Sequence, residues 1–129
     1  MIAIVDTESG AFAVDLDDEA VEPWDSDLAL DPQPILNLPR LVAAAAAGAT
    51  VIAVVDAKPP IVVSHDAGVT WRESGRGLPA GRAVALSPDD PDTAVYAGRN
   101  RLYVTSDGGL FWRALAVELP EIRALELRS

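Results

Sequence analysis

The sequence contains no cysteine, which excludes disulfide bonds and thiolate metal sites. It has a single histidine, His65, and no second histidine or cysteine to join it in a metal site or a nucleophile–base pair. Ser64 precedes His65 directly, but neighbouring side chains of a strand point to opposite faces, so the two do not form a catalytic pair. The cysteine and histidine pairs that most often build metal and nucleophile sites are therefore absent.

Long apolar segments are absent as well. The longest apolar run, residues 41–47, is too short to cross a bilayer, which takes about 20 residues of helix. The first residues, MIAIVD, carry no basic charge and do not resemble a secretory signal. We therefore expect a soluble, cytoplasmic protein without a membrane span.

Basic residues are missing from the first third of the chain. Residues 1–39 contain ten acids and no lysine or arginine, whereas residues 40–129 contain ten acids and ten bases. The net charge of −10 thus arises entirely in the first third, which argues against nucleic acid as a partner because phosphates would be repelled. These carboxylates either solvate an exposed face or form an electrostatic handle for an arginine-rich surface, such as the other end of an identical chain.

The chain of 129 residues has the length of one domain, and we expect residues 1–129 to form a single domain. Half of the residues are apolar, which is a high share for a chain with this net charge. Surplus apolar surface on a small soluble protein often marks an interface with another chain.

Three landmarks recur with a period near 41 residues. Leu-Pro pairs, tryptophans and short β-type segments keep the same order in each copy. This period, with short strands separated by turns, favours a β-propeller with four strands in each unit. The landmarks are Leu38-Pro39, Leu78-Pro79 and Leu119-Pro120; Trp24, Trp71 and Trp112; and residues 2–6, 52–56 and 94–98.

Residues 41–47, LVAAAAA, conflict with this pattern. Alanine is the strongest helix former, so local propensity predicts a short helix here. The repeat instead makes the segment the first strand of a unit, followed by a turn at Gly48 and a strand over residues 50–55. We give precedence to the repeat, since small side chains suit a crowded position near a propeller axis.

Two pieces that lie 41 residues apart share the pattern S/T-x-D-x-G-x-T/F-W, namely Ser64–Trp71 and Thr105–Trp112. The pattern resembles the Asp-box, or BNR repeat, of sialidases, sortilin-type receptors and photosystem II assembly factors. The resemblance covers residues 51–129 well and residues 1–50 loosely. It implies an all-β fold of about three four-stranded propeller blades, which is half of a six-bladed β-propeller.

Each residue of the motif has a physical role in a tight turn. The aspartate accepts hydrogen bonds from backbone N–H groups, the glycine permits a positive φ, and the hydroxyl bonds locally. The tryptophan buries a large apolar area between blades. The resemblance implies that these residues are structural rather than catalytic. They are Ser64, Asp66, Gly68, Thr70 and Trp71 in one copy, and Thr105, Asp107, Gly109, Phe111 and Trp112 in the other.

The first unit departs from the motif. Residues 15–19, DLDDE, followed by Trp24, stand where another copy belongs, but they lack the glycine and the distance to the tryptophan is longer. A calcium loop is an alternative use for this carboxylate cluster, but it has no glycine at the position that an EF-hand needs. We expect neither a metal nor a cofactor.

The repeat predicts blade-like units at about 1–39, 40–79 and 80–120, with 121–129 as a strand that completes a blade. Three blades do not close a ring, since propellers typically have four to eight. An open half-propeller would expose apolar faces and an unpaired edge. We therefore expect completion by a second chain. One version is a homodimer in which residues 122–127 of each chain complete the first blade of the other, and the competing version uses a different protein.

The function predicted is that of a non-catalytic protein-interaction or assembly subunit. One alternative is a carbohydrate-binding, lectin-like module, which would show exposed aromatics near blade junctions. A second is a sialidase-like glycoside hydrolase, although no pair of carboxylates in a pocket can be located from the sequence. Candidate partner contacts are loop arginines and the irregular segment 15–31, specifically Trp24, Asp25, Asp27, Arg72, Arg76, Arg99 and Arg101.

Overall fold

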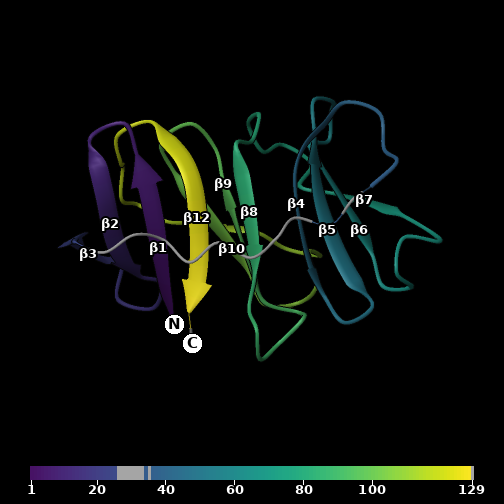
Figure 1. The fold of residues 1–129 in the computed structure, drawn as a ribbon, viewed down its shortest axis with the longest axis horizontal. Helices are drawn as coiled ribbons and strands as arrows, with labels where there is room; N and C mark the ends of the chain where they lie inside the picture. The colour runs from purple at the N-terminus through teal and green to yellow at the C-terminus, as the bar shows by residue number, and fades with distance from the viewer. Residues whose placement is uncertain (26–33, 35, 129) are drawn as a thin grey trace.

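A computed structural model describes residues 1–25, 34 and 36–128, and these residues form twelve β-strands in three four-stranded sheets (Figure 1). Every pair of neighbouring strands is antiparallel. Asp27, one of the candidate contact residues, lies outside the described residues. Within the described part of the chain no helix is long and apolar enough to span a membrane.

Each sheet is one blade, with its strands ordered from the inside of the molecule outward. Blade 1 consists of β12 (Ile122–Arg128), β1 (Ile2–Thr7), β2 (Gly10–Asp15) and β3 (Ala20–Trp24). Blade 2 consists of β4 (Leu41–Ala47), β5 (Thr50–Val55), β6 (Ile61–Ser64) and β7 (Arg72–Ser74). Blade 3 consists of β8 (Ala83–Leu86), β9 (Ala94–Ala97), β10 (Leu102–Thr105) and β11 (Arg113–Ala114).

Blade 3 lies between blades 1 and 2, and the innermost strands β12, β8 and β4 run side by side (Figure 1). These three strands line a groove of about 410 Å³. Its wall is rich in alanine, including Ala43–Ala46, Ala83 and Ala85. Small side chains therefore occupy the place where the innermost strands approach one another.

The alanine-rich segment is the strand β4, as the repeat predicted, and not a helix. It pairs with β5 from Ala43 opposite Val54 to Ala47 opposite Thr50. Ala43 and Ala44 are buried within the half-ring, as we call the row of three blades. Pairing with a strand rich in β-branched residues thus outweighs the helix propensity of alanine, which is a weak preference beside tertiary contacts.

The last strand, β12, pairs with β1 of its own chain, from Ile2 opposite Arg128 to Val5 opposite Leu125. The expected exchange of this strand between two chains is therefore wrong for this structure. The physical reason lies in the loop before β12. Glu8 N–H donates to the carbonyl of Glu121 at 2.9 Å, and Ile122 N–H donates to that of Arg99 at 2.7 Å, so the strand is held beside β1.

Two apolar clusters hold the blades together. One lies between blades 1 and 3 and contains Val5, Val95 and Leu125; the other lies between blades 2 and 3 and is centred on Tyr96. Tyr96 is fully buried and donates its hydroxyl to the carbonyl of Pro79 at 2.6 Å. Burial raises the pKa of this phenol well above its ordinary value, so it stays a neutral hydrogen-bond donor.

Candidate interaction surfaces

The turn from Ser64 to Trp71 is closed around the carboxylate of Asp66. Its Oδ1 accepts hydrogen bonds from the Ser64 hydroxyl at 2.7 Å and the Thr70 N–H at 2.9 Å. Its Oδ2 accepts the Thr70 hydroxyl at 2.5 Å. The Thr70 hydroxyl is the largest of the causes that lower the pKa of Asp66 to about 2. Gly68 supplies the positive φ, +90°, that this turn requires.

The turn from Thr105 to Trp112 repeats this geometry with one difference. Oδ1 of Asp107 accepts the Thr105 hydroxyl at 2.8 Å and the Phe111 N–H at 3.0 Å, and the Phe111 N–H is the main cause that lowers the pKa of Asp107. Phe111 stands where the other turn has Thr70 and has no hydroxyl. No described side chain therefore donates a hydrogen bond to Oδ2 of Asp107. The side chain of Phe111 is 70% exposed.

The two tryptophans that end these turns differ in their surroundings. Trp112 packs against the cluster between blades 2 and 3, and its indole N–H donates to the Ser74 hydroxyl at 2.9 Å. Ser74 in turn donates to the carbonyl of Gly109. Trp71 is half-buried beside Gly68 of its own turn, because blade 2 stands at the end of the half-ring.

Arginines connect blade 2 to a hairpin of blade 3, and blade 3 to a hairpin of blade 1. Arg72 donates to the carbonyl of Gly108 at 2.8 Å, and Arg113 donates to that of Leu16 at 3.1 Å. The two arginines occupy matching places, since each is the first residue of an outermost strand and directly follows a tryptophan. Arg72 was expected to be an exposed loop arginine, but it is a half-buried residue of β7 that ties blade 2 to blade 3.

The acidic residues 15–19 connect β2 to β3 and are held against blade 3. Glu19 accepts a hydrogen bond from Ala116 N–H at 2.6 Å and lies 4.0 Å from the guanidinium of Arg113. Asp15 caps its own turn, and the Asp18 N–H is the main cause that lowers its pKa. No three acids or histidines in the described ranges are grouped so that they could hold a metal ion.

Trp24 does not close this hairpin as Trp71 and Trp112 close theirs. It is the last residue of β3, whereas the other two directly precede β7 and β11. Its ring lies 5.0 Å from the guanidinium carbon of Arg128, and its Nε1 is buried with no hydrogen-bond partner among the residues that the structure describes. The longer spacing seen in the sequence thus reflects a different position on the blade.

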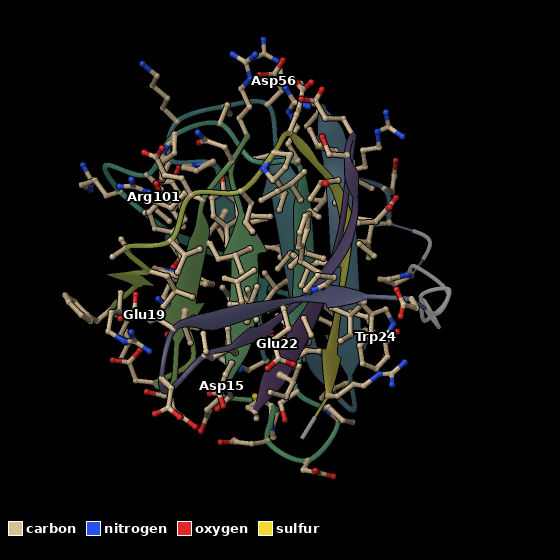
Figure 2. The ribbon with its side chains drawn as sticks, turned by 90° about the vertical axis from the view of Figure 1, so that its left-hand side faces the viewer. Asp15, Glu19, Glu22, Trp24, Asp56 and Arg101 are labelled. Carbon is tan, nitrogen blue, oxygen red and sulfur yellow. The ribbon has the colours of Figure 1, made fainter. Side chains whose placement is uncertain are left out.

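Charge is divided between the two ends of the strands. The turns at one end, called here the acidic end, contain no lysine or arginine; the loops at the other, called the basic end, contain most of the basic residues. Figure 2 shows Asp15 at the former, and Asp56 and Arg101 toward the latter. The acidic end comprises residues 15–19, 48–49, 65–70, 87–92 and 106–111, and the basic end comprises residues 8–9, 39–40, 56–60, 75–82, 98–101 and 116–121.

Three of the candidate arginines lie at the basic end. Arg99 is mostly exposed, 3.6 Å from Glu121, and Arg101 bonds to Glu118 at 2.8 Å. Arg76 is exposed and has no ion-pair or hydrogen-bond partner among the described residues. Trp24 ends the outermost strand of blade 1 and Asp25 follows it, and Figure 2 places Trp24 on the side opposite Arg101. The predicted contact residues therefore do not form one patch.

A cavity of about 520 Å³ opens at the acidic end between blades 1 and 3, and the sequence did not predict it. Phe111, at a motif position that holds threonine in the other copy, is the feature that could have drawn attention to it. The cavity is lined by Met1, Leu16, Asp17, Thr93, Val104, Ser106, Asp107, Phe111 and Arg113.

No protein-family model and no curated protein matches the chain. Among solved structures it is similar to YCF48 in a structure described as YCF48 bound to D1 peptide, with 18% identity and a TM-score of 0.52. It is also similar to the GH74 enzyme of Niastella koreensis, with 21% identity and a TM-score of 0.50.

Each comparison covers 92% of this chain, but only 37% of the YCF48 chain and 18% of the GH74 chain. The chain therefore spans well under half the length of either protein. Both are propeller proteins, and at this level of identity the likeness concerns the fold alone. Together with its three antiparallel four-stranded sheets, it shows that the chain is an all-β protein built from β-propeller blades.

Proposed function

We propose that this chain is a non-catalytic protein-interaction or assembly subunit whose half-propeller is completed by a second chain in the cytoplasm. The observation that carries the proposal is the half-ring itself. Its three blades are joined by apolar clusters and arginine contacts on both sides of blade 3, while blades 1 and 2 form the two ends. Since propellers typically have four to eight blades, a partner that adds blades would extend these contacts.

We further propose that the two hairpin turns are Asp-boxes. Both turns begin with a serine or a threonine, and the hydroxyl of that residue donates a hydrogen bond to the aspartate at the centre of the turn. That hydroxyl also accepts the N–H of Gly68 in one copy, at 2.8 Å, and of Gly109 in the other, at 3.0 Å. A shared set of bonds in two sequence-distant turns supports a structural role for the motif.

The basic end is the surface proposed to contact a protein partner. Arg76 and Arg99 present exposed guanidinium groups, which suit carboxylates because they donate in a planar fork. The likeness to YCF48, which was solved with a bound peptide, supports a peptide segment as the partner, and the exposed guanidinium groups favour an acidic one.

The test is affinity capture of the native protein followed by mass measurement of the complex. A complex of twice 13.6 kDa supports completion by a second copy, and a larger partner supports a different protein. The double variant Arg76→Ala/Arg99→Ala should lose the partner, whereas Lys58→Ala, which removes a charge from the same end, should retain it. A protein that stays at 13.6 kDa and captures nothing would refute the proposal.

Carbohydrate binding is the second candidate, and exposed Phe111 at the junction of blades 1 and 3 is the observation that favours it. A glycan array without hits would exclude it. A glycoside hydrolase is the third, since one structural neighbour is such an enzyme. A fluorogenic sialoside assay without turnover would exclude the sialidase-like version.

A further inference from the structure

We infer that the cavity between blades 1 and 3 at the acidic end binds an arginine side chain from a basic segment of a partner protein. The inference uses the end of the molecule opposite to the one proposed above for partner contact. It therefore stands or falls independently of that proposal.

The shape and lining of the cavity suit a long side chain with a charged head. Met1, Leu16 and Val104 contribute apolar surface, and Leu16 is buried. The aliphatic stem of an arginine can cover such surface while its guanidinium remains at the polar rim. Exposed Phe111 stands at this rim and offers an aromatic face on which a guanidinium can stack.

Asp107, which lines the same cavity, lacks a hydrogen-bond donor that the matching aspartate of blade 2 has. In the turn of blade 2, Oδ2 of the aspartate is occupied by the hydroxyl of Thr70. In the turn of blade 3 the threonine is replaced by Phe111, so no described side chain donates a hydrogen bond to Oδ2 of Asp107. Phe111, compared with threonine at the same position, thus lacks a hydroxyl donor for the aspartate and adds an aromatic ring beside it. Both changes favour a cationic donor from outside.

The two cationic groups at the cavity, the terminal amine and Arg113, each have a partner of their own. Asp17 is largely exposed, and its one ion-pair partner in the described part of the chain is the terminal amine, at 3.6 Å. Arg113 also lines the cavity, but it is engaged with Leu16 and Glu19.

The wider surface around the cavity is also negative. The neighbouring turn at residues 87–92 adds Asp89, Asp90 and Asp92 without any basic residue. A field of this sign attracts a basic segment and gives no advantage to a neutral sugar.

The test is a titration of the isotope-labelled full chain followed by its amide NMR shifts. The probe is the peptide acetyl-Gly-Leu-Arg-Leu-Gly-amide, and its analogue with neutral citrulline in place of arginine is the matched control. We expect saturable shifts at Asp17, Ser106 and Phe111, and binding of the citrulline peptide at least about tenfold weaker, because the charge-assisted hydrogen bond is lost. Equal binding of both peptides, or shifts spread evenly over all acidic turns, would overturn the inference.

Variants locate the site. Phe111→Thr gives the turn of blade 3 the threonine that stands in the turn of blade 2, so the variant should fold. The new hydroxyl should donate a hydrogen bond to Oδ2 of Asp107, and binding of the arginine peptide should be abolished. Asp17→Asn should weaken binding several-fold and provides a second test if the first variant does not fold. Asp56→Asn removes a charge from the basic end and should change nothing.

Unchanged binding by Phe111→Thr and Asp17→Asn would contradict the proposal. Two further outcomes would assign the cavity to another occupant. Concentration-dependent shifts at the same residues in the protein alone would assign it to a second copy, and saturable shifts with a glycan would assign it to carbohydrate. Either result would overturn the arginine assignment.

Discussion

Trp112 donates its indole N–H to the hydroxyl of Ser74, 2.9 Å away, and Ser74 donates to the carbonyl of Gly109 in the turn that Trp112 ends. The two residues belong to different blades and are 38 positions apart. A single buried serine therefore fixes both the tryptophan and the turn of blade 3 against the outermost strand of blade 2.

Replacing this serine should be costly. Ser74→Ala leaves the Trp112 N–H and the Gly109 carbonyl without partners at a packed junction, and we expect a loss of about 1–3 kcal/mol in the free energy of unfolding. Denaturant unfolding checks this value against Ser9→Ala, an exposed serine at a hairpin turn. Equal midpoints for the two variants would show that the relay contributes nothing.

Arg72 of blade 2 should stabilise the fold through its hydrogen bond to blade 3. Arg72→Ala removes the 2.8 Å hydrogen bond to the Gly108 carbonyl, and a bond from a charged donor of this kind contributes about 1.5–3 kcal/mol. Arg76→Ala, an exposed arginine four positions later, is the control and should leave stability unchanged. Thermal unfolding of the two variants measures the difference in stability. If Arg72→Ala unfolds at the same temperature as Arg76→Ala, the hydrogen bond to Gly108 does not stabilise the blade junction.

The sequence predicted the blades because their landmarks are local. A Leu-Pro pair, a turn motif and a tryptophan repeat within each unit, and these features also overcame the helix propensity of residues 41–47. It did not predict which chain supplies the partner of β1, because that depends on the loop contacts of Glu121 and Ile122 with other blades. It also missed the cavity beside Phe111, since a cavity arises from two blades that are distant in sequence.

Gly81 should tolerate no side chain. A Cβ built at this residue would lie 2.3 Å from Cε1 of Tyr96, far inside contact distance, and Tyr96 is fixed by its hydrogen bond to Pro79. We expect Gly81→Ala to lower the free energy of unfolding by about 1–3 kcal/mol through overpacking. Gly98→Ala, where the nearest atom would lie at 3.4 Å, is the control. If both variants unfold at the same denaturant concentration, the close approach of Tyr96 is not rigid.

The hydroxyl of Thr70 should set the acid titration of Asp66. Because the folded pKa, about 2, lies below the ordinary value near 3.8, the stabilisation is fully present above that ordinary value. It is lost as the pH falls toward 2. Thr70→Ala removes the largest cause of the shift, so the pKa of Asp66 should rise toward its ordinary value. The acid loss of stability should then be smaller and be complete at a higher pH, while its onset stays near the ordinary value.

The two turns provide each other's control in this titration. Thr70→Ala should leave Asp107 unchanged, and Phe111→Thr should lower the pKa of Asp107 further by adding the missing donor to Oδ2. Carboxyl carbon shifts followed through an NMR titration resolve the two aspartates. If Asp66 titrates alike with and without the Thr70 hydroxyl, the bond at 2.5 Å is not formed in solution.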